Sequence, residues 1–274
     1  MSIADVRTSN GPDTSAPAYL VFDTETVPDG KLLAMVKYAD QHLSPEDAIR
    51  QAQAEARAQS RDQSDFVPVS FQFPIAICVL RVGGDYRIQG LTCLDSPQYR
   101  PREIVRLFWK GVGLYNSAKL VSYNGRGFDL PLLELAAFRY GYAPESHFRN
   151  GRHRYNGHID LCDWISNYGA CRLAGGLNLL SKLLGKPGKM EVTGDNVYPM
   201  YCAGQIQDIN DYCMFDTLDT YFVFLRSRVV VGALPLPREQ ELVAESKQWI
   251  QDKLSTQPAL SKYLSNWGDW APWP

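Results

Sequence analysis

The segment YLVFDTETVP (residues 19–28) carries an apolar run directly into two acids. Its pattern predicts a buried strand that ends at the turn signal Pro28-Asp29-Gly30. Asp23 and Glu25 are two residues apart, so on a strand their side chains point to the same face. Two like charges so placed repel unless one takes up a proton or a cation is bound. The pair indicates a hard divalent cation such as Mg²⁺ or Mn²⁺, and two solvated acids at a strand end are the alternative.

The bulk composition is that of an ordinary globular protein. The 274 residues are 45% hydrophobic and 21% charged, with a net charge of −2. Any nucleic-acid partner would therefore have to be bound by a local basic patch. No apolar run approaches the roughly 20 residues that span a bilayer, so no membrane association is expected. The six cysteines form no CxxC pair, which favours free thiols and a cytoplasmic location.

Three strand patterns open the chain, and strand and helix patterns then alternate. The strands are expected at residues 18–27, 74–84, 85–94, 119–125 and 158–164, and the helices at 101–115, 129–141, 176–185 and 205–230. Gly83-Gly84-Asp85 is a hairpin signal between the second and third strands. This order predicts an α/β fold, with a mixed sheet flanked by helices on both faces.

Segments outside this pattern divide the chain further. Residues 1–17 are expected to be a disordered leader, residues 18–230 the main domain, and residues 231–274 a C-terminal helical tail. Residues 31–66 predict a polar helical insertion, with a helix start at Ser44-Pro45. That insertion either covers the substrate as a lid or is a surface helix pair. The tail, with one amphipathic helix and a tryptophan-rich end, either docks on the domain or contacts a partner.

Two further places put acids near the first pair. Asp129 begins a predicted helix, where it is either a ligand or a helix cap. Tyr212 and Asp216 are four residues apart on the longest predicted helix, so they share one face. Asp208 and Asp219 share that face too, so spacing alone does not select Asp216, and a solvated acidic face is the alternative.

Taken in order, these acids and their neighbours resemble the three exonuclease motifs of the DEDD superfamily, in its DEDDy branch. The matching positions are Phe22-Asp23-x-Glu25, Asn124-x-x-x-Phe128-Asp129 and Tyr212-x-x-x-Asp216. The flanking text HIDL, LLGKPGKM, GDNVY and YCMFDTLDTYFVFLR resembles predicted 3′-5′ exonucleases related to the proofreading domains of family-B DNA polymerases. The resemblance covers about residues 18–230 and implies a ribonuclease H-like fold.

The resemblance also implies an activity, namely metal-dependent hydrolysis of single-stranded nucleic acid from its 3′ end to 5′-mononucleotides, with DNA favoured. Two divalent ions, Mg²⁺ or Mn²⁺, would be held by Asp23, Glu25, Asp129 and Asp216. Tyr212 would help to orient the attacking water. The alternatives are a non-catalytic nucleic-acid-binding module on the same fold and an RNA-directed 3′-5′ exonuclease. Either enzyme would act alone or with a separate protein partner.

Substrate contacts are expected from two regions. By the resemblance, Asn124 and Phe128 would contact the terminal nucleotides, and Thr24, between the first two acids, is placed with them. The loop FRNGRHRYNGH (residues 148–158) is basic around an aromatic residue, which suits a phosphate backbone and a stacked base. Arg152 and Arg154 are therefore predicted to bind substrate, and a solvated loop is the alternative.

Some chemistry-bearing residues are expected to be structural or auxiliary. His158, Cys162 and Cys171 are too loosely spaced to predict zinc, and a thiol pair in the core with a loop histidine is preferred. Asp160 and Asp163 are expected to be structural because the four-acid set is already complete. Three lysines near the GKPGK turn would extend the basic patch: Lys182, Lys186 and Lys189.

Overall fold

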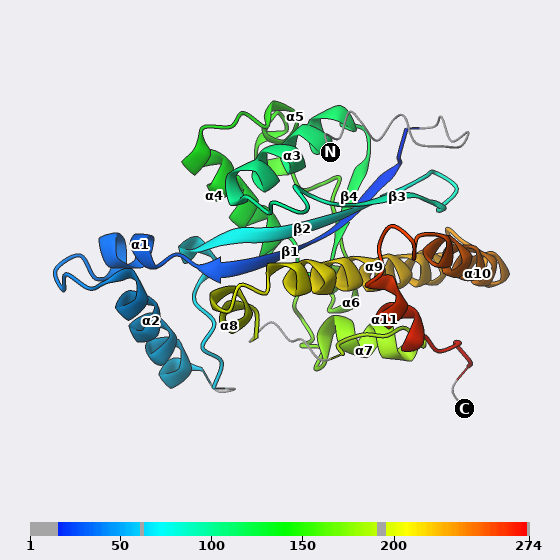
Figure 1. The fold of residues 1–274 in the computed structure, drawn as a ribbon. Helices are drawn as coiled ribbons and strands as arrows, with labels where there is room; N and C mark the ends of the chain where they lie inside the picture. Colours follow the sequence, from blue (N-terminus) through cyan, green and yellow to red (C-terminus); the bar gives the residue numbers. More distant parts are fainter. Residues whose placement is uncertain (1–15, 61–62, 191–195, 273–274) are drawn as a thin grey trace.

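The computed structural model describes residues 16–60, 63–190 and 196–272. A five-stranded sheet with the order β3-β2-β1-β4-β5 forms its centre (Figure 1). The strands are β1 (Tyr19–Pro28), β2 (Gln72–Val82), β3 (Ile88–Cys93), β4 (Lys119–Ser122) and β5 (Ile159–Asp160). β1, β2 and β3 pair antiparallel, whereas β4 and β5 join parallel to β1 and to each other. The predicted mixed sheet is confirmed, and the strand that carries the first two acids is its middle strand.

Alternating side chains of β1 face two separate cores. Leu20 and Phe22 are buried with residues of α3 (Pro101–Leu114) and α4 (Asp129–Tyr140). Val21 is buried on the opposite face with residues of α9 (Ile206–Val230). Figure 1 shows α3, α4 and α5 (Glu145–Phe148) on one side of the sheet, and α9 on the other. Helices therefore flank both faces, as the sequence predicts.

The insertion after β1 folds as helices with a small core of their own. It contains α1 (Gly30–Leu32), the π-helical turn η2 (Leu33–Lys37) and α2 (Pro45–Gln59). The Ser44 hydroxyl caps α2 by accepting from the Asp47 amide at 3.1 Å. Gly30 is required here, because a Cβ at this position would lie 2.3 Å from the Pro45 carbonyl oxygen. Figure 1 shows this unit projecting from the end of β1.

The predicted strand at residues 158–164 is wrong beyond its first residues. β5 ends at Asp160, and α6 (Leu161–Ile165) begins immediately. The cause is capping: the Asp160 carboxylate accepts from the backbone amides of Cys162 and Asp163. Four further short elements lie elsewhere in the chain: η3 (Val69–Phe71) before β2, η4 (Gly151–His153) before β5, and α7 (Gly176–Leu183) and α8 (Val197–Cys202) between α6 and α9.

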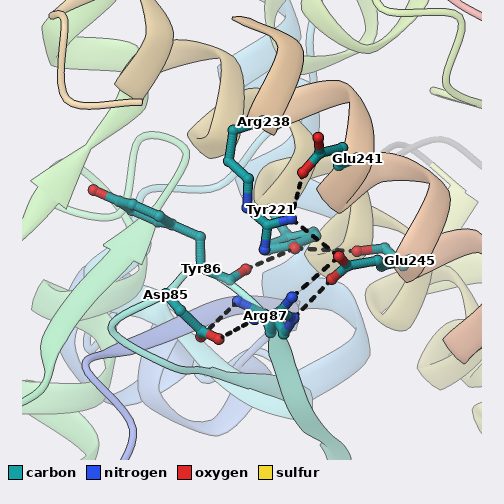
Figure 2. A network of polar contacts seen from close by, with 8 residues as sticks. Asp85, Tyr86, Arg87, Tyr221, Arg238, Glu241 and Glu245 are labelled. Carbon is teal, nitrogen blue, oxygen red and sulfur yellow. Dashed lines mark hydrogen bonds and ion pairs between the residues drawn. The ribbon is translucent and has the colours of Figure 1, made fainter. Parts of the chain in front are cut away.

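The C-terminal residues contain two helices where the sequence predicts one. These are α10 (Leu236–Asp252) and the short α11 (Leu260–Ser265). Figure 2 shows how α10 is tied to the β2–β3 hairpin: the Arg87 guanidinium contacts Glu245 at 2.8 Å. In the same network Tyr221 of α9 donates to the backbone carbonyl of Tyr86 at 2.9 Å. The tail therefore packs on the domain.

The tryptophan-rich end covers a buried lysine. The Lys186 ammonium lies 3.9 Å from the centre of the Trp267 ring and donates to the Gly268 carbonyl at 3.3 Å. Burial lowers the pKa of Lys186 to about 8. Lys186 is thus a structural residue and not part of a basic patch, which corrects the sequence prediction. The predicted leader lies almost wholly outside the described residues, and in the described ranges no helix is long and apolar enough to cross a membrane.

Candidate active site

Asp23 and Glu25 leave the middle of β1 on the face covered by α9. Both side chains point to the same face of β1 as Val21, whose side chain packs in the core beside α9. Asp216 of α9 faces them, and one carboxylate oxygen from each of the three lies within 4.8 Å of the others. The thiol of Cys213, one turn before Asp216, donates to the Asp23 backbone carbonyl at 3.3 Å and ties the helix to the strand. The two acids on β1 and the one on α9 therefore meet as a group of three carboxylates.

The structure selects Asp216 among the acids of α9. Asp208 is exposed to solvent at the start of the helix. Asp219 is buried but accepts a hydrogen bond from the Tyr263 hydroxyl at 2.6 Å, which connects it to α11. Tyr212 lies one turn before Asp216 and is buried beside the acids. The spacing alone left this choice open because all four residues share the helix face.

Asp129 is a neighbour of the three-carboxylate group rather than a member of it. It is the first residue of α4, and the capping position belongs to Phe128, whose side chain makes no capping bond. Asp129 Oδ1 and Thr24 Oγ1 are buried, and neither has a hydrogen-bond partner by distance and angle among the residues that the structure describes. Because Asp129 is the first helical residue rather than the N-cap, the capping alternative does not account for its place.

The acids strongly perturb one another. Burial, followed by the charge of Asp129, raises the pKa of Asp23 to about 8. Burial raises the pKa of Asp129 to about 7. Burial and the neighbouring carboxylates raise the pKa values of Glu25 and Asp216 well above their usual range. A divalent cation would relieve this repulsion, and the unpartnered oxygen of Asp129 is a free ligand for it, so the residues present fit a metal site.

A buried aspartate shapes the loop between β4 and α4. The Asp160 carboxylate accepts from the backbone amides of Asn124 (2.9 Å) and Arg126 (2.8 Å). Asn124 has a left-handed backbone (φ 65°), and its side chain is exposed to solvent. Asp163 lies 3.3 Å from the Arg126 guanidinium. The structural roles predicted for Asp160 and Asp163 agree with these contacts.

Lys189 differs from its neighbours in the GKPGK region because its charge lowers the pKa values of Glu25 and Asp216. Its backbone amide donates to Asn178 Oδ1 of α7 at 2.8 Å. Gly188 before it has φ 58°, and a Cβ there would lie 2.5 Å from the same Asn178 oxygen. The sequence pattern groups Lys189 with two other lysines, because only the fold distinguishes it from buried Lys186.

The predicted basic loop is partly engaged within the fold. Arg154 makes two contacts with the Glu134 carboxylate of α4, at 2.7 and 2.8 Å. It also lies over the ring of Tyr155, 4.9 Å from its centre, whereas Arg152 is exposed. These contacts hold Arg154 against α4 and do not link it to the acids, so the assignment of both arginines to substrate binding stays a prediction.

The residues weighed against zinc do not form the arrangement that the sequence suggested. His158 is buried and its Nε2 is 2.8 Å from the Ser122 hydroxyl, so it is a core residue rather than a loop histidine. Cys171 is exposed and Cys162 is half-buried, which contradicts the expected core pair. The thiols that do meet are Cys78 and Cys93, 3.3 Å apart on β2 and β3. All six cysteines are free, as predicted.

A mixed sheet between two helical layers, with carboxylates gathered on its middle strand and a facing helix, defines a ribonuclease H-like exonuclease fold. Residues 64–267 match the family described as predicted 3′-5′ exonucleases related to the exonuclease domain of PolB, and the chain belongs to this family. No curated protein matches the chain.

The matched residues differ from the range expected from the motifs. They begin after Asp23 and Glu25 and continue past residue 230 through α10 and α11. Asp23 and Glu25 are connected to the matched residues by geometry, since Asp216 lies within that range and its carboxylate meets theirs. Nucleic acid is the substrate class that membership of this family implies.

Proposed function

We propose that this protein is an active metal-dependent 3′-5′ exonuclease that degrades single-stranded nucleic acid, with DNA favoured, to 5′-mononucleotides. The observation that carries the proposal is the meeting of Asp23, Glu25 and Asp216, one carboxylate oxygen of each within 4.8 Å of the others, beside the buried carboxylate of Asp129. A surface cluster of acids would be solvated, whereas these carboxylates are crowded enough to raise each other's pKa.

The four acids would hold two divalent ions, Mg²⁺ or Mn²⁺. When bound, such ions activate a water for attack on a phosphodiester and stabilise the leaving 3′ oxygen. The pKa of Tyr212 is raised far above its usual value by burial and by Asp216, so its hydroxyl stays protonated. Tyr212 would therefore orient the attacking water by hydrogen bonding rather than remove its proton. Lys189 would offer positive charge to the phosphate from the edge of the acid group.

Substrate residues are proposed on both sides of the acids. Asn124 and Phe128 belong to the loop that Asp160 fixes, and the buried Thr24 side chain lies beside Asp129. These groups would contact the terminal nucleotides. Arg152 and Arg154 would contact the phosphate backbone farther along the strand, and for Arg154 this requires sharing its guanidinium with Glu134.

The test is timed digestion of 3′-labelled and 5′-labelled single-stranded DNA and RNA with Mg²⁺, Mn²⁺ or EDTA. We expect metal-dependent shortening from the 3′ end, faster on DNA. Asp216→Asn should reduce the rate by more than the roughly 10- to 100-fold that loss of an outer partner costs at metal sites. Asp208→Asn is the matched control, because it removes an exposed charge from the same helix.

Each alternative predicts a distinct result in this assay. A non-catalytic binding module would retain the labelled strands without shortening them under any metal. An RNA-directed exonuclease would shorten RNA faster than DNA. Equal rates for Asp216→Asn and Asp208→Asn would show that the three-carboxylate group takes no part in cleavage.

A further inference from the structure

An exposed aromatic side chain from the insertion lies against the substrate loop. Phe66 has 52% of its surface exposed, although it is a large apolar residue. Its ring centre is 5.6 Å from that of Phe128, and the two ring planes are tilted by 54°. Phe128 immediately precedes Asp129, so the pair joins the insertion to the edge of the acid site.

The backbone around Phe66 is fixed on both sides. The neighbouring Asp65 pairs with Arg57 of α2 at 2.7 Å, and the Phe66 amide donates to the Ser64 hydroxyl at 3.3 Å. Val67, the next residue, is buried in the insertion's own core, and its carbonyl accepts from Gln72 at 2.5 Å. The ring is therefore held outward by an ordered segment, which keeps the entropic cost of using it low.

A hollow opens beside the same ring. It has a volume of about 310 Å³ and lies between α2 and the segment that leads to η3. Its lining is mixed: Ala52, Ala56, Phe66 and Pro68 are apolar, and the Lys37–Glu55 ion pair is among the polar groups. Phe66 thus lines the hollow and also contacts Phe128. Its flat ring, with polar side chains nearby, suits a nucleobase.

We propose that Phe66 stacks on a base of the substrate strand, so that the insertion supplies a base-binding subsite next to Phe128. This inference rests on the proposed function, since it names how that site holds single-stranded nucleic acid. Stacking on an aromatic ring needs an unpaired base and accepts every base, because each has a flat face. Phe66 therefore selects single strands over duplexes without selecting a sequence.

The contact with Phe128 also has a purely structural explanation, in which Phe66 only packs the insertion onto α4. Substrate binding in EDTA, followed by fluorescence anisotropy of a labelled oligonucleotide, separates the two. We expect Phe66→Ala to weaken binding of single-stranded DNA about tenfold. Phe66→Trp should retain wild-type affinity, and Phe66→Leu, which keeps an apolar side chain without a flat ring, should not.

The control variant is Phe138→Ala, which removes an exposed phenylalanine from the far end of α4. We expect it to bind as wild type does. A set of oligonucleotides with one abasic position near the 3′ end completes the test. At one position the missing base should weaken binding to wild type but not to Phe66→Ala. The variant has already lost the ring on which that base would stack, so removing the base costs it nothing further.

The outcomes separate this inference from the proposed function. If wild type binds and degrades DNA while Phe66→Ala matches Phe138→Ala, stacking by Phe66 is wrong and the exonuclease stands. Stacking by Phe66 is equally wrong if every abasic position weakens both proteins to the same extent. If wild type neither binds nor shortens single strands, the proposed function fails and the subsite with it.

Discussion

Asp129 and Asp219 are both buried carboxylates near one site, and they differ in the hydrogen bond that Asp219 accepts from α11. Asp219 accepts from Tyr263 at 2.6 Å, so its charge is used to hold α11 against α9. Asp219 Oδ2 and Asp129 Oδ1 each have no hydrogen-bond partner among the described residues, so an unpartnered oxygen alone does not separate the two acids. Sequence spacing cannot separate the two cases, because both residues are acids on helices that border the sheet. The partner that decides it, Tyr263, lies 44 residues away in the chain from Asp219.

The raised pKa values of the acids predict how pH and metal affect stability. The pKa of Asp23 is about 8 and that of Asp129 about 7, against about 4 in an unfolded chain. Between about pH 4 and 8 the folded, ion-free protein holds protons that the unfolded chain has released, so its stability falls as pH rises. We expect the free energy of unfolding in EDTA to decrease from about pH 6 to about pH 8, measured by urea titration.

Added Mg²⁺ or Mn²⁺ should raise the free energy of unfolding more at the higher pH, because the ions then displace fewer protons. In EDTA, Asp23→Asn should show a smaller dependence on pH than wild type. A metal effect of the same size at both pH values would contradict this account of the acids.

At the scale of elements, the loop from β4 to α4 depends on a residue outside it. Asp160 accepts from two of its amides and caps α6 with the same carboxylate. Asp160→Ala would leave these partly buried amides and the start of α6 without their acceptor, and we expect a loss of about 2 kcal/mol in a urea titration. Cleavage should fall as well, since the loop presents Asn124 and Phe128.

Asp163→Ala is the control for Asp160→Ala. Its contact with Arg126 is partly exposed, so its removal should cost about 1 kcal/mol or less. Equal losses for the two variants would mean that Asp160 does not organise the loop.

The sequence predicts best those elements whose boundaries are set by residues close together in the chain. The hairpin at Gly83-Gly84-Asp85, the start of α2 at Ser44-Pro45 and the end of α4 at Gly141 all depend on neighbouring residues, and all are confirmed. The strand predicted through residue 164 is wrong because Asp160 caps a helix there, and the apolar pattern gives no sign of that hydrogen bond. The meeting of residue 23 with residue 216 was inferred by resemblance, since no local pattern carries a contact of that length.

At the scale of the whole molecule, the C-terminal residues close the side of the fold opposite the insertion. Trp267 lies against Phe222 of α9, with ring centres 5.1 Å apart, and covers the Lys186 ammonium. Trp267→Ala should destabilise the protein by about 2 kcal/mol or more, because the buried lysine loses its aromatic contact and a cavity remains. Thermal unfolding at neutral pH measures the loss.

Trp267→Phe, which keeps an aromatic ring over Lys186, should recover most of that stability. A smaller loss for Trp267→Ala than for Trp267→Phe would show that the tail does not depend on this contact.

The order of the strands has a consequence for synthesis on the ribosome. β1 emerges early, but the helix that faces its acids ends at Val230, and the two form one core. A nascent chain therefore carries Asp23 and Glu25 for most of its translation without Asp216, and the three-carboxylate group cannot form. The proposed nuclease activity would therefore be absent from the nascent chain until α9 has left the ribosome.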